Sequence, residues 1–174
     1  MMMTEYEKAC DTLNKFMQYM LEKDMESWTE LWDEHAVLEF PYAPEGFPER
    51  IEGKAAIYDY IKDFPDNIHI SAFTAPTVYR SADTNTIIAE FQCEGYAIAT
   101  GLPYRQTYIS VIETKDGSIL HYKDYWNPLV VNKTFGETIE TFIQTEEEEN
   151  VESRSDSDYG RNRHDRKPDC ATVN

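Results

Sequence analysis

The segment between Leu120 and Pro128 carries the clearest chemical signal, because it places a carboxylic acid between aromatic side chains. Side chains alternate between the faces of a β-strand, so Tyr122, Asp124 and Trp126 share one face here. If that face is buried, the rings exclude water and desolvation raises the pKa of Asp124. Such a carboxyl group can donate a proton near neutral pH. If the face is exposed, Asp124 is an ordinary surface acid, and the residue types leave both interpretations open.

Neighbouring strands supply further hydrogen-bonding side chains. Tyr104, Gln106 and Tyr108 share one face of a predicted strand, although neither face of that strand is cleanly apolar. Glu90 alternates along its strand with apolar residues that indicate a core. It therefore points either to solvent or into a polar cavity, and the pattern favours solvent. His69 lies between two isoleucines that point the other way, so it can reach either a pocket or solvent.

Motifs that hold a metal ion or a nucleotide are missing from the sequence. It has no His-x-His, His-Glu-x-x-His or Cys-x-x-Cys spacing of the kind that ligates zinc. It also has no Gly-x-Gly-x-x-Gly or phosphate-binding loop and no Gly-x-Ser-x-Gly nucleophile motif. We therefore expect neither a metal site nor a cofactor.

The elements that position these residues are read from hydrophobic periodicity. A helix is expected over 6–21, a second over 24–35 that ends at His35, and a third over 53–64 that stops at Pro65. The expected strands are 36–40, 68–73, 77–80, 86–99, 104–114 and 118–126, and a last short helix is expected over 135–143. Helices followed by an antiparallel meander predict an α+β fold, in which a strongly curved sheet is closed by helices into a cone. A pocket at the mouth of such a cone is the default binding site.

The composition indicates how the chain is divided into a domain and a tail, and which classes of partner it disfavours. The chain has 174 residues and a formal net charge of -17, which disfavours nucleic acids and anionic membranes as partners. We expect one folded domain over 1–145 and a charged, disordered tail over 146–174, which contains no Leu, Ile, Phe, Trp or Met. Three dispersed cysteines and the lack of a signal-peptide pattern or membrane span indicate a reduced, cytoplasmic protein.

Several short segments resemble the nuclear transport factor 2-like superfamily. They are Glu-Phe-Pro-Tyr-Ala-Pro at 39–44, Ile-Glu-Gly-Lys-Ala-Ala-Ile at 51–57, Thr-Gly-Leu-Pro-Tyr at 100–104 and, as the strongest, Asp-Gly-Ser-Ile at 116–119 leading to Lys-Asp-Tyr-Trp-Asn-Pro at 123–128. Over about residues 5–145 the chain is similar to the SnoaL-like branch, especially the phenazine biosynthesis A/B-like proteins. The resemblance implies the cone-shaped α+β fold, with three or four helices packed on a curved antiparallel sheet.

The resemblance also implies where a reaction takes place. In relatives that hydrolyse epoxides or condense phenazine precursors, an acid on the last strand donates a proton, and the matching residue is Asp124. The phenazine proteins also use a His from the third helix, which here has none, and the second Asp and the Arg of the hydrolases have no secure counterpart. Ketosteroid isomerases use a Tyr on the first helix and an Asp after the first strand. The matching residues are Phe16 and Phe40, which argues against that activity.

These observations favour a cofactor-independent enzyme that acts on a small, partly apolar metabolite. The expected reactions are condensation, cyclisation, isomerisation or dehydration, with Asp124 as the general acid. The expected substrate-binding residues are Tyr42, His69, Glu90, Tyr104, Gln106, Tyr108, Tyr122 and Trp126. The alternative is a non-catalytic ligand-binding or dimerisation module on the same fold. An enzyme needs Asp124 buried in a cleft with a second hydrogen-bonding group within reach, whereas a pure binder can leave it exposed.

We expect the protein to form a homodimer, because proteins of the resembled fold pair through the outer face of the sheet. Sedimentation at micromolar concentration should give about twice the chain mass of 20.3 kDa. A monomer over the whole micromolar range would contradict this expectation.

Overall fold

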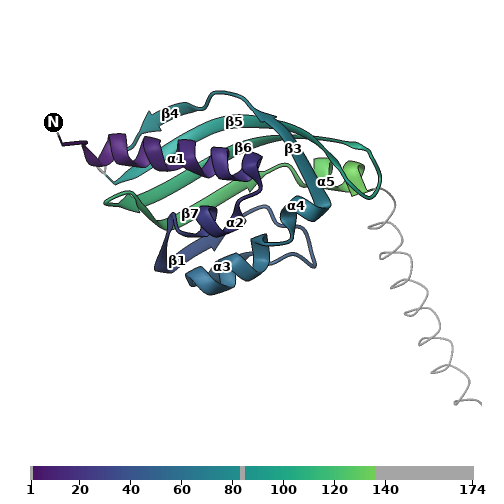
Figure 1. Cartoon of the computed structure of the whole chain (residues 1–174), viewed down its shortest axis with the longest axis horizontal. Helices are drawn as coiled ribbons and strands as arrows, with labels where there is room; N and C mark the ends of the chain where they lie inside the picture. Colours follow the sequence, from purple (N-terminus) through teal and green to yellow (C-terminus); the bar gives the residue numbers. More distant parts are fainter. Residues whose placement is uncertain (1, 83–84, 136–174) are drawn as a thin grey trace, which may run out of the picture. The chain divides into compact units, whose positions relative to one another are not determined.

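Two runs of the chain, residues 2–82 and 85–135, are described by the computed structural model (Figure 1). Its elements are α1 (Glu5–Glu22), α2 (Met25–Thr29), β1 (Trp32–Glu39), β2 (Arg50–Glu52), α3 (Lys54–Ile61), α4 (Phe64–Asn67), β3 (Ile68–Phe73), β4 (Thr77–Arg80), β5 (Thr86–Ala97), β6 (Pro103–Lys115), β7 (Ser118–Trp126) and α5 (Pro128–Phe135). The predicted tail over 146–174, and the predicted last helix beyond Phe135, lie outside the described residues.

The strands form a curved, mixed sheet in the order β2-β1-β7-β6-β5-β3, and β4 also pairs with β5 (Figure 1). The predicted antiparallel pairing of the strands after Pro65 is confirmed. The first strand adds one parallel pair, because β1 runs alongside β7 after a connection that spans most of the domain. This pairing puts β7 between β1 and β6 in the sheet, where both of its edges are hydrogen-bonded.

A two-residue turn fixes the register of β6 against β7. Asp116 and Gly117 have φ angles of 50° and 85°, and positive φ at both positions is what a tight type I′ hairpin requires. The turn pairs Lys115 with Ser118, and after one irregularity the ladder pairs Ser110 with Asp124. The Thr12 hydroxyl donates to the Gly117 carbonyl at 2.7 Å and so attaches α1 to this hairpin.

The helices cover one face of the sheet. α1 has a capping box at Thr4 and Glu7, and its apolar stripe packs on the inner face. The core between the layers is strongly aromatic: Trp28 and Trp32 are both 2% exposed, and their rings lie 5.0 Å apart. Within the described ranges, none of the helices is both long and apolar enough to cross a membrane.

Several element boundaries differ from those predicted, and the largest differences are at the second helix and at two prolines. The second helix ends at Thr29, and Trp32 and His35 belong to β1, where strand pairing with β7 overrides the helical spacing. Pro65 does not end a helix but stands in the first turn of α4, a position where its missing N–H costs nothing. Pro128 likewise begins α5, which starts before the predicted last helix. Short proline-containing helices are hard to distinguish from loops by periodicity.

Gly95 of β5 is a position where no side chain fits. A Cβ atom there would lie 2.0 Å from the backbone oxygen of His69 on the neighbouring strand. We expect Gly95→Ala to lower the free energy of unfolding by about 2 kcal/mol or more, because the backbone of β3 must move. Gly46→Ala is the control, since its Cβ would meet nothing within 4 Å and only the positive φ carries a cost. Thermal unfolding of both variants with equal shifts in Tm would contradict this prediction.

Candidate functional site

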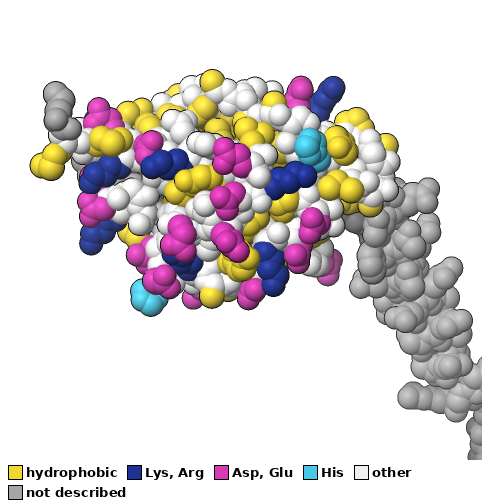
Figure 2. Space-filling view, viewed as in Figure 1, with side chains coloured by type: hydrophobic (Ala, Val, Ile, Leu, Met, Phe, Trp, Pro, Cys, Tyr) yellow, Lys and Arg dark blue, Asp and Glu magenta, His cyan; other side chains and the backbone are white. Residues whose placement is uncertain are grey.

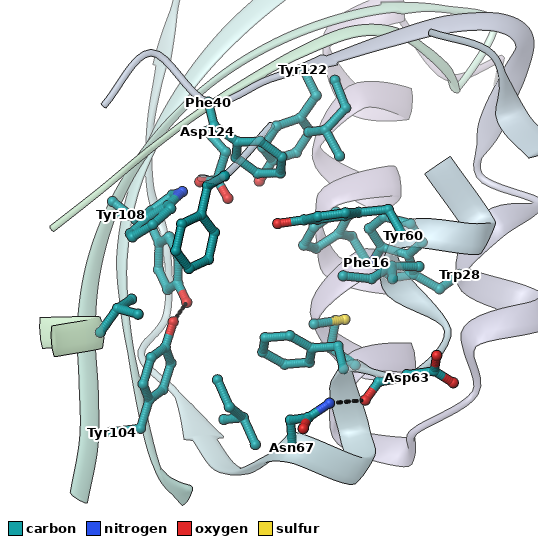
Figure 3. Close-up of a pocket in the computed structure, with 18 of the residues that line it drawn as sticks. Phe16, Trp28, Phe40, Tyr60, Asp63, Asn67, Tyr104, Tyr108, Tyr122 and Asp124 are labelled. Carbon is teal, nitrogen blue, oxygen red and sulfur yellow. Dashed lines mark hydrogen bonds between the residues drawn. The ribbon is translucent and has the colours of Figure 1, made fainter. Parts of the chain in front are cut away.

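A cavity of about 310 Å³ lies between the inner face of the sheet and the helices. That volume is at the lower end of the range for pockets that bind small molecules. Most of its wall is aromatic: rings come from α1, α2 and α3 on one side and from β5, β6 and β7 on the other (Figure 3). Phe47, in the loop between β1 and β2, lies 6.1 Å from the ring of Trp126 and adds the loop to the wall.

Asp124 is the acid in this wall, and its environment is what the strand pattern predicted for a buried face. Its side chain borders the cavity together with Tyr122 and Trp126. One carboxylate oxygen, Oδ1, is buried and has no hydrogen-bond partner among the described residues. Desolvation raises the pKa of Asp124 from 3.8 to about 7. The carboxyl group is therefore divided between its protonated and ionised forms at neutral pH.

Two hydroxyl groups of β6 form a second polar feature of the cavity. The Tyr104 and Tyr108 hydroxyls lie 3.1 Å apart, and the Tyr108 hydroxyl also lies 3.6 Å from Sγ of Cys93 (Figure 3). Burial raises the pKa of all three groups. They therefore stay neutral at physiological pH and act as hydrogen-bonding groups rather than as charges.

Tyr60 approaches the cavity from the opposite side. It comes from α3, its ring packs 5.5 Å from that of Phe40, and its hydroxyl points into the cavity (Figure 3). Burial raises its pKa, and the negative charge of Asp124 raises it further. Both side chains border the same cavity, Tyr60 from α3 and Asp124 from β7 (Figure 3).

The structure places five of the predicted site residues together around the cavity. They are Asp124, Tyr104, Tyr108, Tyr122 and Trp126. Tyr122 is 2% exposed, and its hydroxyl donates to Ser110 Oγ at 2.8 Å. It thereby supports the strand that carries Asp124 rather than offering a free hydroxyl.

Three of the other four predicted binding residues lie on the outside of the protein, away from the cavity. Tyr42 is 62% exposed and packs on Tyr125 of the outer face. His69 packs on Tyr96, which is also on the outer face, and Glu90 is exposed and accepts from the Tyr79 hydroxyl.

Gln106 is buried, but its side-chain amide is hydrogen-bonded to the backbone and not directed at a ligand. Its amide donates to the carbonyl of Asn127 and accepts from the Asn127 N–H, so it holds the end of β7 in place. Sequence alternation identified its face correctly, but it could not show that the backbone uses both ends of the amide.

Sequence reasoning also missed residues that line the cavity. Trp28 and Trp32 border it, as do Phe47 and Tyr60, and none of these was among the expected binding residues. Tyr60 falls at the helical spacing of Ile57, Ile61 and Phe64, and that periodicity was the available signal. Phe47 gave none, because a loop residue has no periodic face.

The charges around Asp124 are separated by the sheet. His121 and Lys123 alternate with it and lie on the outer face, where His121 Nε2 is 3.0 Å and Lys123 Nζ is 3.9 Å from Glu39 Oε2. Arg50 also pairs with Glu39. Burial opposes ionisation of Glu39, but hydrogen bonds from His121 and Arg50 outweigh it and lower its pKa. These side chains lie on the outer face and pair with Glu39, so they do not compensate a charge on Asp124.

The cavity wall contains no Lys, Arg or His among the described residues. Asp63 is the second acid that borders the cavity, but its carboxylate points away from it (Figure 3). On the molecular face in Figure 2, Asp and Glu are interspersed with Lys and Arg, so that face offers phosphate groups no continuous basic surface. In the part of the chain that the structure describes, no three His, Cys, Asp or Glu side chains are grouped to hold a metal ion.

The fold and the aromatic cavity define a nuclear transport factor 2-like α+β protein. Within that class, the chain belongs to the SnoaL-like domain family, whose model matches residues 13–122. The resemblance inferred from the short segments is therefore confirmed.

Individual relatives agree with this assignment. The uncharacterised protein YesE of Bacillus subtilis is 75% identical over 147 residues, which are 84% of this chain and 98% of YesE. A solved structure from Bacillus subtilis, provisionally described as an isomerase, is 76% identical with a TM-score of 0.77 and covers 78% of this chain and 98% of its own. The uncharacterised PhzA/B-like protein PA3332 of Pseudomonas aeruginosa is 42% identical over 106 residues, which are 61% of this chain and 74% of PA3332.

Proposed function

We propose that this protein is a small-molecule enzyme that rearranges an enolisable substrate, with Asp124 as its general base and general acid. The observation that carries the proposal is the carboxyl group of Asp124, which borders an aromatic cavity, has an unpartnered oxygen and has its pKa raised to about 7. A group whose pKa lies near the working pH both accepts and returns protons efficiently. The family, and the isomerase and PhzA/B-like descriptions of relatives, agree with this class of chemistry.

The chemistry that this arrangement can perform is proton transfer at a carbon next to a carbonyl group. The ionised Asp124 carboxylate takes the proton from that carbon, and the protonated form returns it to the same or to a neighbouring position. Isomerisation of unsaturated ketones, aldol-type cyclisation and dehydration of β-hydroxyketones, in which the β-hydroxyl group leaves as water, all include such a step. The aromatic wall holds the apolar body of the substrate and keeps bulk water away from the reacting atoms.

The test is whether the protein speeds deuterium exchange at the methyl group of methyl naphthyl ketone in deuterated buffer. This ketone is uncharged and mostly aromatic, so it matches the cavity wall, and its methyl protons exchange only through the enol. Exchange above the buffer rate supports the proposal. Binding of the ketone with no such exchange would instead identify a non-catalytic ligand-binding module.

A further inference from the structure

Four tyrosine hydroxyls belong to the cavity wall, and three of them are already engaged. Tyr104 and Tyr108 bond to each other, and Tyr122 donates to Ser110. The Tyr60 hydroxyl has no hydrogen-bond partner among the residues that the structure describes. Tyr60 is therefore a tyrosine donor that a ligand can use without breaking a bond inside the protein.

The position of this donor is defined by its neighbours. Figure 3 shows the Tyr60 hydroxyl entering the cavity from the helical side, while Asp124 enters from the sheet. Phe40, which is buried, packs against the Tyr60 ring on one side, while Tyr60 itself is 39% exposed at the edge of the cavity. The raised pKa of Tyr60 keeps its hydroxyl protonated, and so able to donate, over the physiological pH range.

The charges of the wall restrict what this donor can bind. Among the described residues, no cationic side chain borders the cavity, and Asp124 supplies negative charge when it is ionised. A carboxylate or phosphate group would be desolvated there without a counter-charge, which is costly. An uncharged carbonyl oxygen needs only a hydrogen-bond donor.

We propose that Tyr60 donates the hydrogen bond that holds the carbonyl oxygen of an uncharged ketone, while Asp124 moves the proton on the adjacent carbon. The inference rests on the proposed function and adds the binding residue and the substrate class. When the proton passes to the Asp124 carboxylate, the C–H electron pair forms the C=C bond and the carbonyl π pair moves onto the oxygen. The Tyr60 hydroxyl stabilises the charge that develops there, and return of the proton from Asp124 reverses each change.

The test compares two probes of similar shape, methyl naphthyl ketone and ethylnaphthalene, which lacks the oxygen. Calorimetry measures their dissociation constants for the wild type, Tyr60→Phe and Tyr58→Phe. We expect the wild type to prefer the ketone about tenfold, and Tyr60→Phe to reduce that preference at least about fivefold, as loss of one hydrogen bond implies. Tyr58 is the matched control, because it lies on the same helix but does not border the cavity.

A structural role for Tyr60 would weaken the binding of both probes equally, so an unchanged ratio in Tyr60→Phe overturns the inference. If that variant keeps the ratio while Asp124→Asn abolishes deuterium exchange, the Tyr60 inference fails and the proposed function stands. If the wild type catalyses no exchange, the proposed function fails, and this role of Tyr60 fails with it. Naphthoate, the carboxylate of the same ring system, should bind at least about tenfold more weakly than the ketone. Equal or tighter binding of naphthoate would overturn the uncharged substrate class.

Discussion

Asp124→Asn should lower the rate of deuterium exchange into methyl naphthyl ketone by about a hundredfold or more. Asparagine keeps the shape and the hydrogen-bonding capacity of the side chain but cannot accept and release the proton. Positioned acid–base groups contribute about 10²–10⁴-fold to rates, and the raised pKa of Asp124 favours the upper part of that range. Proton NMR in deuterated buffer at pH 7 measures the decay of the methyl signal directly.

Asp63→Asn is the matched control for this measurement. Asp63 also borders the cavity, but its carboxylate points away from it, so its removal should leave the exchange rate within about twofold of the wild type (Figure 3). Binding of the ketone should change much less than the rate in Asp124→Asn, because the apolar contacts remain. If Asp124→Asn exchanges deuterium as fast as the wild type, another group moves the proton.

The backbone plan of this protein is predictable from sequence because local rules agree with the final fold. Period-two alternation predicted β3, β4 and β7 with the bounds that the structure has, and Asp-Gly, which stands at 116–117 in the hairpin turn, is a sequence typical of such turns. The same alternation put Tyr122, Asp124 and Trp126 on one face. Which face is buried follows from packing, and the aromatic residues on that face were the only local indication of it.

The membership of the site was only partly predictable, since a cavity is assembled from elements distant in the chain. His69 and Glu90 carry suitable groups but lie on the outer face. Gln106 faces inward, yet Asn127 uses both ends of its amide. Tyr60 is a candidate hydrogen-bond donor to a ligand because its hydroxyl points into the cavity and has no partner among the described residues (Figure 3). Which hydroxyls are already bonded depends on residues that are distant in the chain, so the sequence does not show it.

Asp124 should also make the stability of the fold depend on pH, with a sign opposite to that of most surface acids. Its pKa is raised from 3.8 to about 7 in the folded protein, so the native state binds the proton more tightly than the unfolded chain. Stability is therefore lost as pH rises from about 4 to about 7 and is constant above and below that window. At about 1.4 kcal/mol per pKa unit, the cost reaches at most about 4 kcal/mol, and water inside the cavity reduces it.

Asp124→Asn should remove this cost, so the variant should be more stable than the wild type above pH 7, by an amount on the order of a few kcal/mol. Urea unfolding of both proteins between pH 4 and pH 8 measures the difference, in which titrations common to both proteins cancel. Burial raises the pKa values of Tyr60, Tyr104, Tyr108, Tyr122 and Cys93, and the charge of Asp124 raises them further, so these groups stay neutral throughout the window. If the stability difference between Asp124→Asn and the wild type is the same at pH 4 and pH 8, then Asp124 titrates normally, and the basis of its role as a general acid is removed.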